Sequence, residues 1–252
     1  MHMIKLHSIL LLFLAGILLV GCCGLTLPDL NGDTEEDKPT SGGSTPPTGG
    51  GGGIPPAHAY TVDDLLEAVG NDDRALTEQI LESGVSVNAA DDQGITALMI
   101  ASFFGYDHLA QFLIDEGANV NAEDIDGLTP LMYSAGMGYP ATTQLLINEG
   151  ANVNAEDVED WTVLMFAASG GYEDVVEILI DEGADVNAVD IDGLTALMLA
   201  SVSGYNNVVE LLLDAGAEVN AADADGWTAL RYANEAGYED TAEILENAGG
   251  TQ

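Results

Sequence analysis

The stretch DIDGLTPLM at residues 124–132 returns sixty-six residues later as DIDGLTALM at residues 190–198. At half that offset, 33 residues, the whole C-terminal part of the chain aligns with itself without insertions. The aligned columns are Thr96, Thr129, Thr162, Thr195 and Thr228; Leu98, Leu131, Leu164, Leu197 and Leu230; and Gly105, Gly138, Gly171, Gly204 and Gly237, each followed by Tyr. A fixed period of this length is typical of proteins built from stacked repeats.

One unit, residues 193–225, shows what each copy contains. Thr195–Ser203 is apolar and is followed by Gly204, and Asn206–Asp214 is followed closely by Gly216. Thr is a favoured N-cap, and Gly is the usual residue where a helix ends in a left-handed conformation. The pattern therefore predicts two short helices. The rest of the unit is rich in Asn, Asp and Gly, which predicts a turn or hairpin.

Such a two-helix unit cannot bury its apolar face alone, so the units must stack and atypical units must close both ends. In the last unit Thr241 and Glu246 replace Val208 and Leu213 of the unit before. This predicts a polar outer flank. In the first unit Asp63 stands in the Thr column, and we expect it to cap the first helix.

The unit resembles an ankyrin repeat, with the family's pattern present as Asp190, Gly193, Thr195, Leu197, Ala200 and Gly204. The resemblance covers residues 60–250. It implies an all-α repeat solenoid of six ankyrin repeats of 33 residues, each a helix-turn-helix plus a hairpin loop. The expected repeats are residues 61–93, 94–126, 127–159, 160–192, 193–225 and 226–250.

Two columns depart from the family's pattern. Met, or Arg231 in the last unit, stands in one His column, and Tyr stands in the other. We therefore expect thioether packing where the family uses His hydrogen bonds. Asp160 replaces the turn Gly of the fourth unit, and Asp adopts a positive φ more readily than most residues.

The N-terminus has the features of a leader. Lys5 precedes an apolar run, Ile9–Val20, which is too short to span a bilayer comfortably, and residues 1–21 are predicted to be a signal peptide. The sequence LVGC at residues 19–22 resembles a bacterial lipobox. That resemblance implies that Cys22 is lipidated and becomes the mature N-terminus. The alternative is an ordinary signal peptide that contains Cys.

Residues 22–59 are rich in Gly, Pro, Ser and Thr and have no means of building a core. We interpret them as a lipidated, disordered tether that precedes a repeat domain at residues 60–250. The expected location is the cell envelope, anchored to a membrane through the lipid after export. The membrane and the face, periplasmic or surface, stay open.

The chain is strongly acidic, with a formal net charge of −39 from 4 Lys and Arg against 43 Asp and Glu. Nucleic acid is excluded as a partner because no basic patch is present. Three interpretations remain: a salt-adapted surface, a basic partner protein, or binding of divalent cations. The weak candidates for cation ligands are Asp124, Asp126, Asp190, Asp192, Asp223 and Asp225. No run matches the spaced loop of an EF-hand.

The chain offers no set of residues for catalysis. After the predicted cleavage only His58 and His108 remain, and a triad or a zinc site needs several groups that converge. We expect His108 to be a surface residue. The sequence therefore predicts a protein that is not an enzyme and has no cofactor.

What remains is a binding surface. The ankyrin resemblance implies a concave face of hairpin tips and first helices. Its variable positions are Trp161, Trp227, Ile95, Leu128 and Leu194 after the turn, and Phe103, Phe104, Met137 and Val202 at the ends of first helices. Packing of the post-turn column against the next hairpin stays open for the leucines, whereas binding is favoured for the tryptophans and the phenylalanine pair. The core column is Ile100, Tyr133, Phe166, Leu199 and Tyr232.

These observations favour a monomeric, non-catalytic scaffold that recognises another protein. The alternative function is an acidic, salt-adapted surface module that binds divalent cations or has no specific partner. In both cases the acidic surface leaves the predicted lipid as the only contact with an anionic membrane.

Overall fold

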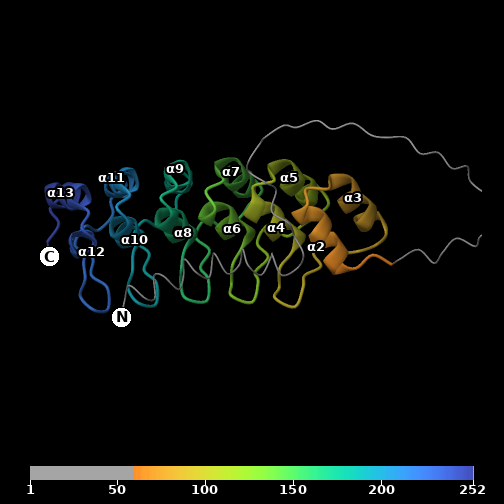
Figure 1. Cartoon of the computed structure of the whole chain (residues 1–252), viewed down its shortest axis with the longest axis horizontal. Coiled ribbons are helices and arrows are strands. Elements are labelled where there is room, and N and C mark those ends of the chain that lie inside the picture. The colour runs from red at the N-terminus through yellow and green to blue at the C-terminus, as the bar shows by residue number, and fades with distance from the viewer. Residues whose placement is uncertain (1–58, 252) are drawn as a thin grey trace, which may run out of the picture. The chain divides into compact units, whose positions relative to one another are not determined.

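The computed structural model describes residues 59–251, and within this range it contains twelve α-helices and no strands. The helices are α2 (Val62–Gly70), α3 (Arg74–Glu82), α4 (Ala97–Phe104), α5 (Asp107–Asp115), α6 (Pro130–Gly136), α7 (Pro140–Asn148), α8 (Val163–Gly170), α9 (Glu173–Asp181), α10 (Ala196–Ser203), α11 (Asn206–Asp214), α12 (Ala229–Ala236) and α13 (Glu239–Asn247). They follow one another as six pairs in a row (Figure 1). The predicted all-α solenoid is confirmed.

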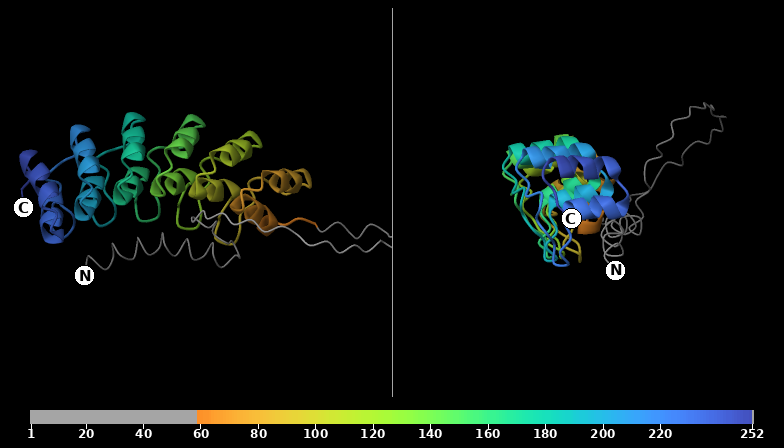
Figure 2. Two further views of the ribbon diagram at one scale, coloured as in Figure 1. Left: turned by 45° about the horizontal axis from the view of Figure 1, so that its top comes forward. Right: turned by 90° about the vertical axis from the view of Figure 1, so that its left-hand side faces the viewer.

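The stack has three layers, which are seen end-on in the right-hand view of Figure 2. The first helices of the pairs pack against one another in the middle layer, and the second helices pack against one another in an outer layer. In Figure 1 the hairpins between pairs hang below the first helices, opposite the second helices. The hairpins hold only isolated antiparallel bridges, such as Ala90 to Thr96.

Stacking supplies the stability that single helices lack. Each helix has only seven to nine residues, and isolated helices shorter than about 12 residues are marginal in water. In α10 every residue from Ala196 to Ser201 is buried. A helix that is apolar on all sides needs cover on all sides, and the hairpins and the second helices supply it.

The predicted helix caps are confirmed in five of the pairs. The Thr side chain at each of these starts accepts a hydrogen bond from the backbone N–H three residues later. These residues are Thr96, Thr129, Thr162, Thr195 and Thr228. Gly105, Gly171, Gly204 and Gly237 end four of the first helices in the left-handed conformation.

Two predictions about the end repeats were wrong. Thr61, not Asp63, caps α2, because the helix begins two residues before the aligned position and Asp64 completes a reciprocal capping box with Thr61. Thr241 is buried rather than part of a polar flank, and its hydroxyl lies 2.5 Å from Asn206 Oδ1. Only Glu246 of the two polar replacements is exposed.

The Met and Tyr columns both have structural roles. The Thr96 N–H donates to Met99 Sδ at 3.3 Å, and the Thr129 N–H donates to Met132 Sδ at 3.4 Å, so these buried thioethers help to close the cap of their own helix. Each tyrosine ring packs on the helix-ending glycine of the repeat before. A Cβ on Gly105, for example, would lie 2.6 Å from the Tyr139 ring.

Thr142 breaks the pattern in the second helices. Its side chain is 1% exposed, and its hydroxyl is the only buried side-chain nitrogen or oxygen without a hydrogen-bond partner within residues 59–251. The equivalent positions of the next two repeats hold Val175 and Val208. A buried hydroxyl without a partner reduces stability.

We predict that Thr142→Val raises the free energy of unfolding by about 1 kcal/mol, because Val has nearly the same shape and carries no polar atom. Urea denaturation followed by circular dichroism measures the change. Thr241→Val is the matched control at the equivalent position of the last repeat. It removes the hydroxyl that bonds Asn206 and should lower stability instead. A Thr142→Val protein no more stable than the parent would contradict this account.

Candidate partner-binding surface

Each hairpin is held by one aspartate. Asp124 Oδ1 accepts the N–H groups of Asp126 and Leu128, both at 2.9 Å, which fixes the turn between them. The same pair of bonds recurs in the other hairpins, at Asp91, Asp157, Asp190 and Asp223. The turn does not need any particular side chain at the residue between the two acids.

The second oxygen of this aspartate holds a ring in three hairpins. Tyr133 donates its hydroxyl to Asp124 Oδ2 at 2.6 Å, and Tyr232 donates to Asp223 Oδ2 at 2.5 Å. Trp161 Nε1 reaches across to the next hairpin and donates to Asp190 Oδ2 at 3.0 Å. The carboxylates of this column therefore connect the hairpins to the layer beneath.

The ionisation of these groups reflects their burial. Burial raises the pKa of the Asp190 carboxyl, although the N–H groups of Leu194, Asp192 and Trp161 act in the opposite direction. Burial also raises the pKa of the Tyr133 hydroxyl, and its hydrogen bond to Asp124 adds to the effect. These groups serve structure, and their arrangement offers no exposed acid and base side by side.

The candidate cation ligands do not converge. Within residues 59–251 there is no group of three His, Cys, Asp or Glu side chains placed to hold a metal ion. The first acid of each candidate motif already accepts hydrogen bonds from its own turn. The second acids, at Asp126, Asp192 and Asp225, belong to separate hairpins.

Successive hairpins are joined by backbone hydrogen bonds at their tips. The Ile125 N–H donates to Gln93 O at 3.0 Å, and the equivalent bonds are Val158 to Asp126 at 3.0 Å, Ile191 to Glu159 at 3.2 Å and Ala224 to Asp192 at 2.9 Å. The backbones come so close that a Cβ on Gly94 would lie 2.9 Å from Asp124 Cα. In the fourth hairpin Asp160 takes the place of this glycine at φ 60°, as predicted.

Three of these tips carry large exposed apolar side chains. Ile125, Val158 and Ile191 are 60%, 64% and 60% exposed, and we call this row the tip ridge. The backbone bonds place the three residues at equivalent points of successive hairpins. A hydrophobic row in such an acidic surface has no role in the core of the domain, so it is the feature of this stack most suited to contact a partner.

Sequence reasoning missed the tip ridge, although the signal was present. In DIDG the two aspartates and the glycine explain the turn, but the isoleucine between them does not contribute to it. An apolar residue that neither caps a helix nor follows the core periodicity was the observation that could have identified Ile125 and Ile191.

The nine predicted binding residues divide into two groups. Trp161, Leu194 and Phe103 are buried. The other six, which are half-buried, are Ile95, Leu128, Phe104, Met137, Val202 and Trp227. Trp161 is 3% exposed, lies 5.2 Å from the Phe166 ring and bonds Asp190, so it packs between hairpins instead of forming an exposed anchor.

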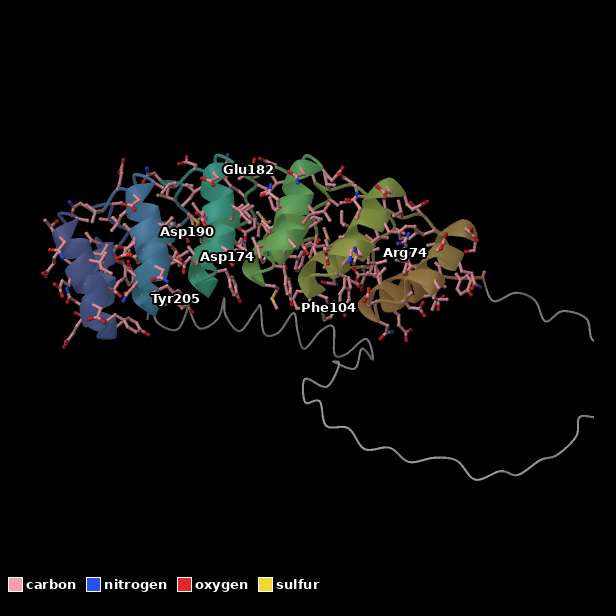
Figure 3. All side chains as sticks on the ribbon, turned by 90° about the horizontal axis from the view of Figure 1, so that it is seen from above. Arg74, Phe104, Asp174, Glu182, Asp190 and Tyr205 are labelled. Atoms are coloured by element: carbon pink, nitrogen blue, oxygen red, sulfur yellow. The ribbon has the colours of Figure 1, made fainter. Side chains whose placement is uncertain are left out.

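The half-buried aromatic residues are partly covered by their own neighbours. Trp227 lies in the last hairpin, and the Arg231 guanidinium stacks over its ring at 4.1 Å. Phe104 stacks on Tyr106 at 5.4 Å between ring centroids. Phe104 and Tyr205 lie along one edge of the stack, and Glu182 lies along the opposite edge (Figure 3). Contact of these residues with a partner stays a prediction.

The remaining side chains follow the sequence analysis closely. Ile100, Phe166, Leu199 and Tyr232 are buried as predicted, whereas Tyr133 is half-buried. His108 is exposed at the start of α5. The search for membrane-spanning helices over residues 59–251 finds no candidate with the length and hydropathy needed. Cys22 lies outside the described residues.

Comparison with known proteins supports the repeat architecture. A family model described as ankyrin repeats (3 copies) matches residues 65–157, 141–223 and 164–251. The overlapping matches run through all six helix pairs. No curated protein matches the chain.

Proposed function

Because the chain belongs to the ankyrin-repeat family, we propose that it is a non-catalytic scaffold that recognises another protein through its hairpin side. Ankyrin repeats generally serve as protein-protein interaction modules. In this chain, the observation that supports such a function is the tip ridge, whose three apolar side chains are exposed on a rigid backbone. A surface whose backbone is ordered before binding loses less entropy when a partner docks.

Substitution of the tip ridge should separate recognition from folding. We predict that Ile125→Ser, Val158→Ser and Ile191→Ser together reduce capture of a partner by the immobilised chain at least about tenfold, because three apolar contacts are lost. The measurement is capture from cell-envelope and secreted fractions, quantified by mass spectrometry. Circular dichroism should show unchanged folding, since the three side chains are exposed.

Ala224→Ser is the matched control, because Ala224 occupies the same tip position with a small side chain. It should capture the partner as the parent does. Equal capture by the triple variant and the parent would show that the tip ridge is not the binding surface. Capture of no specific protein by any form would favour the acidic structural module.

We also propose that the scaffold is lipid-anchored at the cell envelope through Cys22. The LVGC sequence at residues 19–22 and the apolar run before it support this proposal. The acidic surface of the domain supports it too, because an anionic membrane repels the protein and another means of attachment is needed. A diacylated N-terminus with a further chain gives stable attachment.

We predict that Cys22→Ser moves the protein from the membrane fraction to the soluble fraction and abolishes incorporation of a labelled fatty acid. Expression in a bacterial host, followed by fractionation and gel fluorography, measures both effects. Cys23→Ser is the control, since the adjacent cysteine is not the lipobox residue and its loss should leave both readouts unchanged. Labelling that survives in Cys22→Ser, or disappears in Cys23→Ser, would contradict lipidation at Cys22.

A further inference from the structure

The tip ridge alternates between apolar and acidic groups along the stack. Each apolar tip is followed in sequence by an acid, and these acids are Asp126, Glu159 and Asp192. Asp126 and Glu159 are exposed, and Asp192 is half-buried. Unlike the first acid of each hairpin, they do not close the turn with their side chains. The ridge thus presents hydrophobic contacts and carboxylates together.

No positive charge lies near enough in sequence to balance these carboxylates. Residues 75–230 contain no Lys or Arg. The two arginines within residues 59–251 are in the first and last helix pairs, and both stack on rings: Arg74 over Phe112 at 4.7 Å and Arg231 over Trp227 at 4.1 Å. The tip ridge therefore lies in an acidic field whose neutralisation must come from ions or from a partner.

We infer that the tip ridge binds a cationic amphipathic helix of a partner protein, in which apolar residues alternate with Lys or Arg. The inference rests on the proposed recognition function and specifies its partner. An apolar side chain alone would gain contact with Ile125, Val158 and Ile191, but the flanking carboxylates would lose water without compensation. A partner with basic residues beside its apolar ones satisfies both groups and is attracted at long range.

The state of the tip backbone favours a helix over a strand. The amides of Ile125, Val158 and Ile191 already donate to the hairpin before, so they are not available to pair with an added strand. Contact must then be made through side chains, and a helix satisfies its own backbone groups. Packed helices lie about 8–10 Å apart, and residues seven apart in a helix are separated by about 10 Å, so one partner helix can match successive tips.

The test uses a synthetic helical peptide of about 20 residues, with Leu at every seventh position and Lys on the flanking positions. Binding of the dye-labelled peptide to the whole chain is followed by fluorescence anisotropy. We expect saturable binding that weakens at least about tenfold in the Ile125→Ser, Val158→Ser, Ile191→Ser protein. Replacing Lys by Glu in the peptide should abolish binding, and replacing Leu by Ser should weaken it to the level of the triple variant.

A second variant isolates the charge. Asp126→Asn, Glu159→Gln and Asp192→Asn together should weaken binding and make it less sensitive to salt. The control removes the same number of charges from exposed ends of second helices, with Asp115→Asn, Asp181→Asn and Asp214→Asn. The control protein should bind within about twofold of the parent, because its changes lie on the outer layer and screened charges act weakly at that range.

Equal binding by the parent and the triple serine variant would overturn the inference, because the peptide would then respond only to overall charge. Equal weakening by the two sets of charge substitutions would overturn it as well. If the tip ridge is required for capture of a natural partner but the cationic peptide does not bind, recognition stands and the cationic helix is rejected. If the tip ridge is required in neither experiment, both proposals fail.

Discussion

The hydrogen bond from each tip amide to the carbonyl of the preceding hairpin holds the hairpin side in register. It can form only where the two backbones come close, and the glycine of the turn permits this approach: at Gly94 a side chain would collide with Asp124 Cα. The aspartate that closes the turn fixes each hairpin from within. Because single helices of seven to nine residues are not stable alone, every repeat depends on such contacts with its neighbours.

The same constraint explains how structure and function are divided among the acidic residues. The first aspartate of each hairpin is engaged by amides and, in three hairpins, by a Tyr or Trp side chain. That engagement removes it from any role in binding. The tip residue is different, because its backbone is fixed while its side chain is not used. The solenoid therefore holds Ile125, Val158 and Ile191 exposed at a regular spacing.

Much of the fold could be predicted from the period of 33 residues. Asn206–Asp214 was predicted as a helix with its observed bounds, and the Thr caps were identified one by one, because caps and helix ends depend on local chemistry. The end repeats were less predictable. Thr241 looked like a surface residue because it is polar, but a hydroxyl can be buried when a partner such as Asn206 lies within reach.

The candidate site was harder to predict for a physical reason. A post-turn Trp is compatible with either an exposed anchor or a packed side chain, and the choice depends on the distance between hairpins, which the sequence does not contain. Trp161 is covered because the next hairpin supplies Asp190 as an acceptor. Trp227 has no further hairpin after it and is only half-buried.

Hydrogen-deuterium exchange of the tip amides, resolved by NMR, tests most directly whether the hairpins form one rigid surface. The account predicts that the amides of Ile125, Val158, Ile191 and Ala224 exchange at least about tenfold more slowly than that of Asp92, although all five lie at hairpin tips. Asp92 occupies the first hairpin, and no earlier hairpin of the described residues offers its amide an acceptor. Equal exchange at all five tips would show that the hairpins move independently, and the account would be wrong.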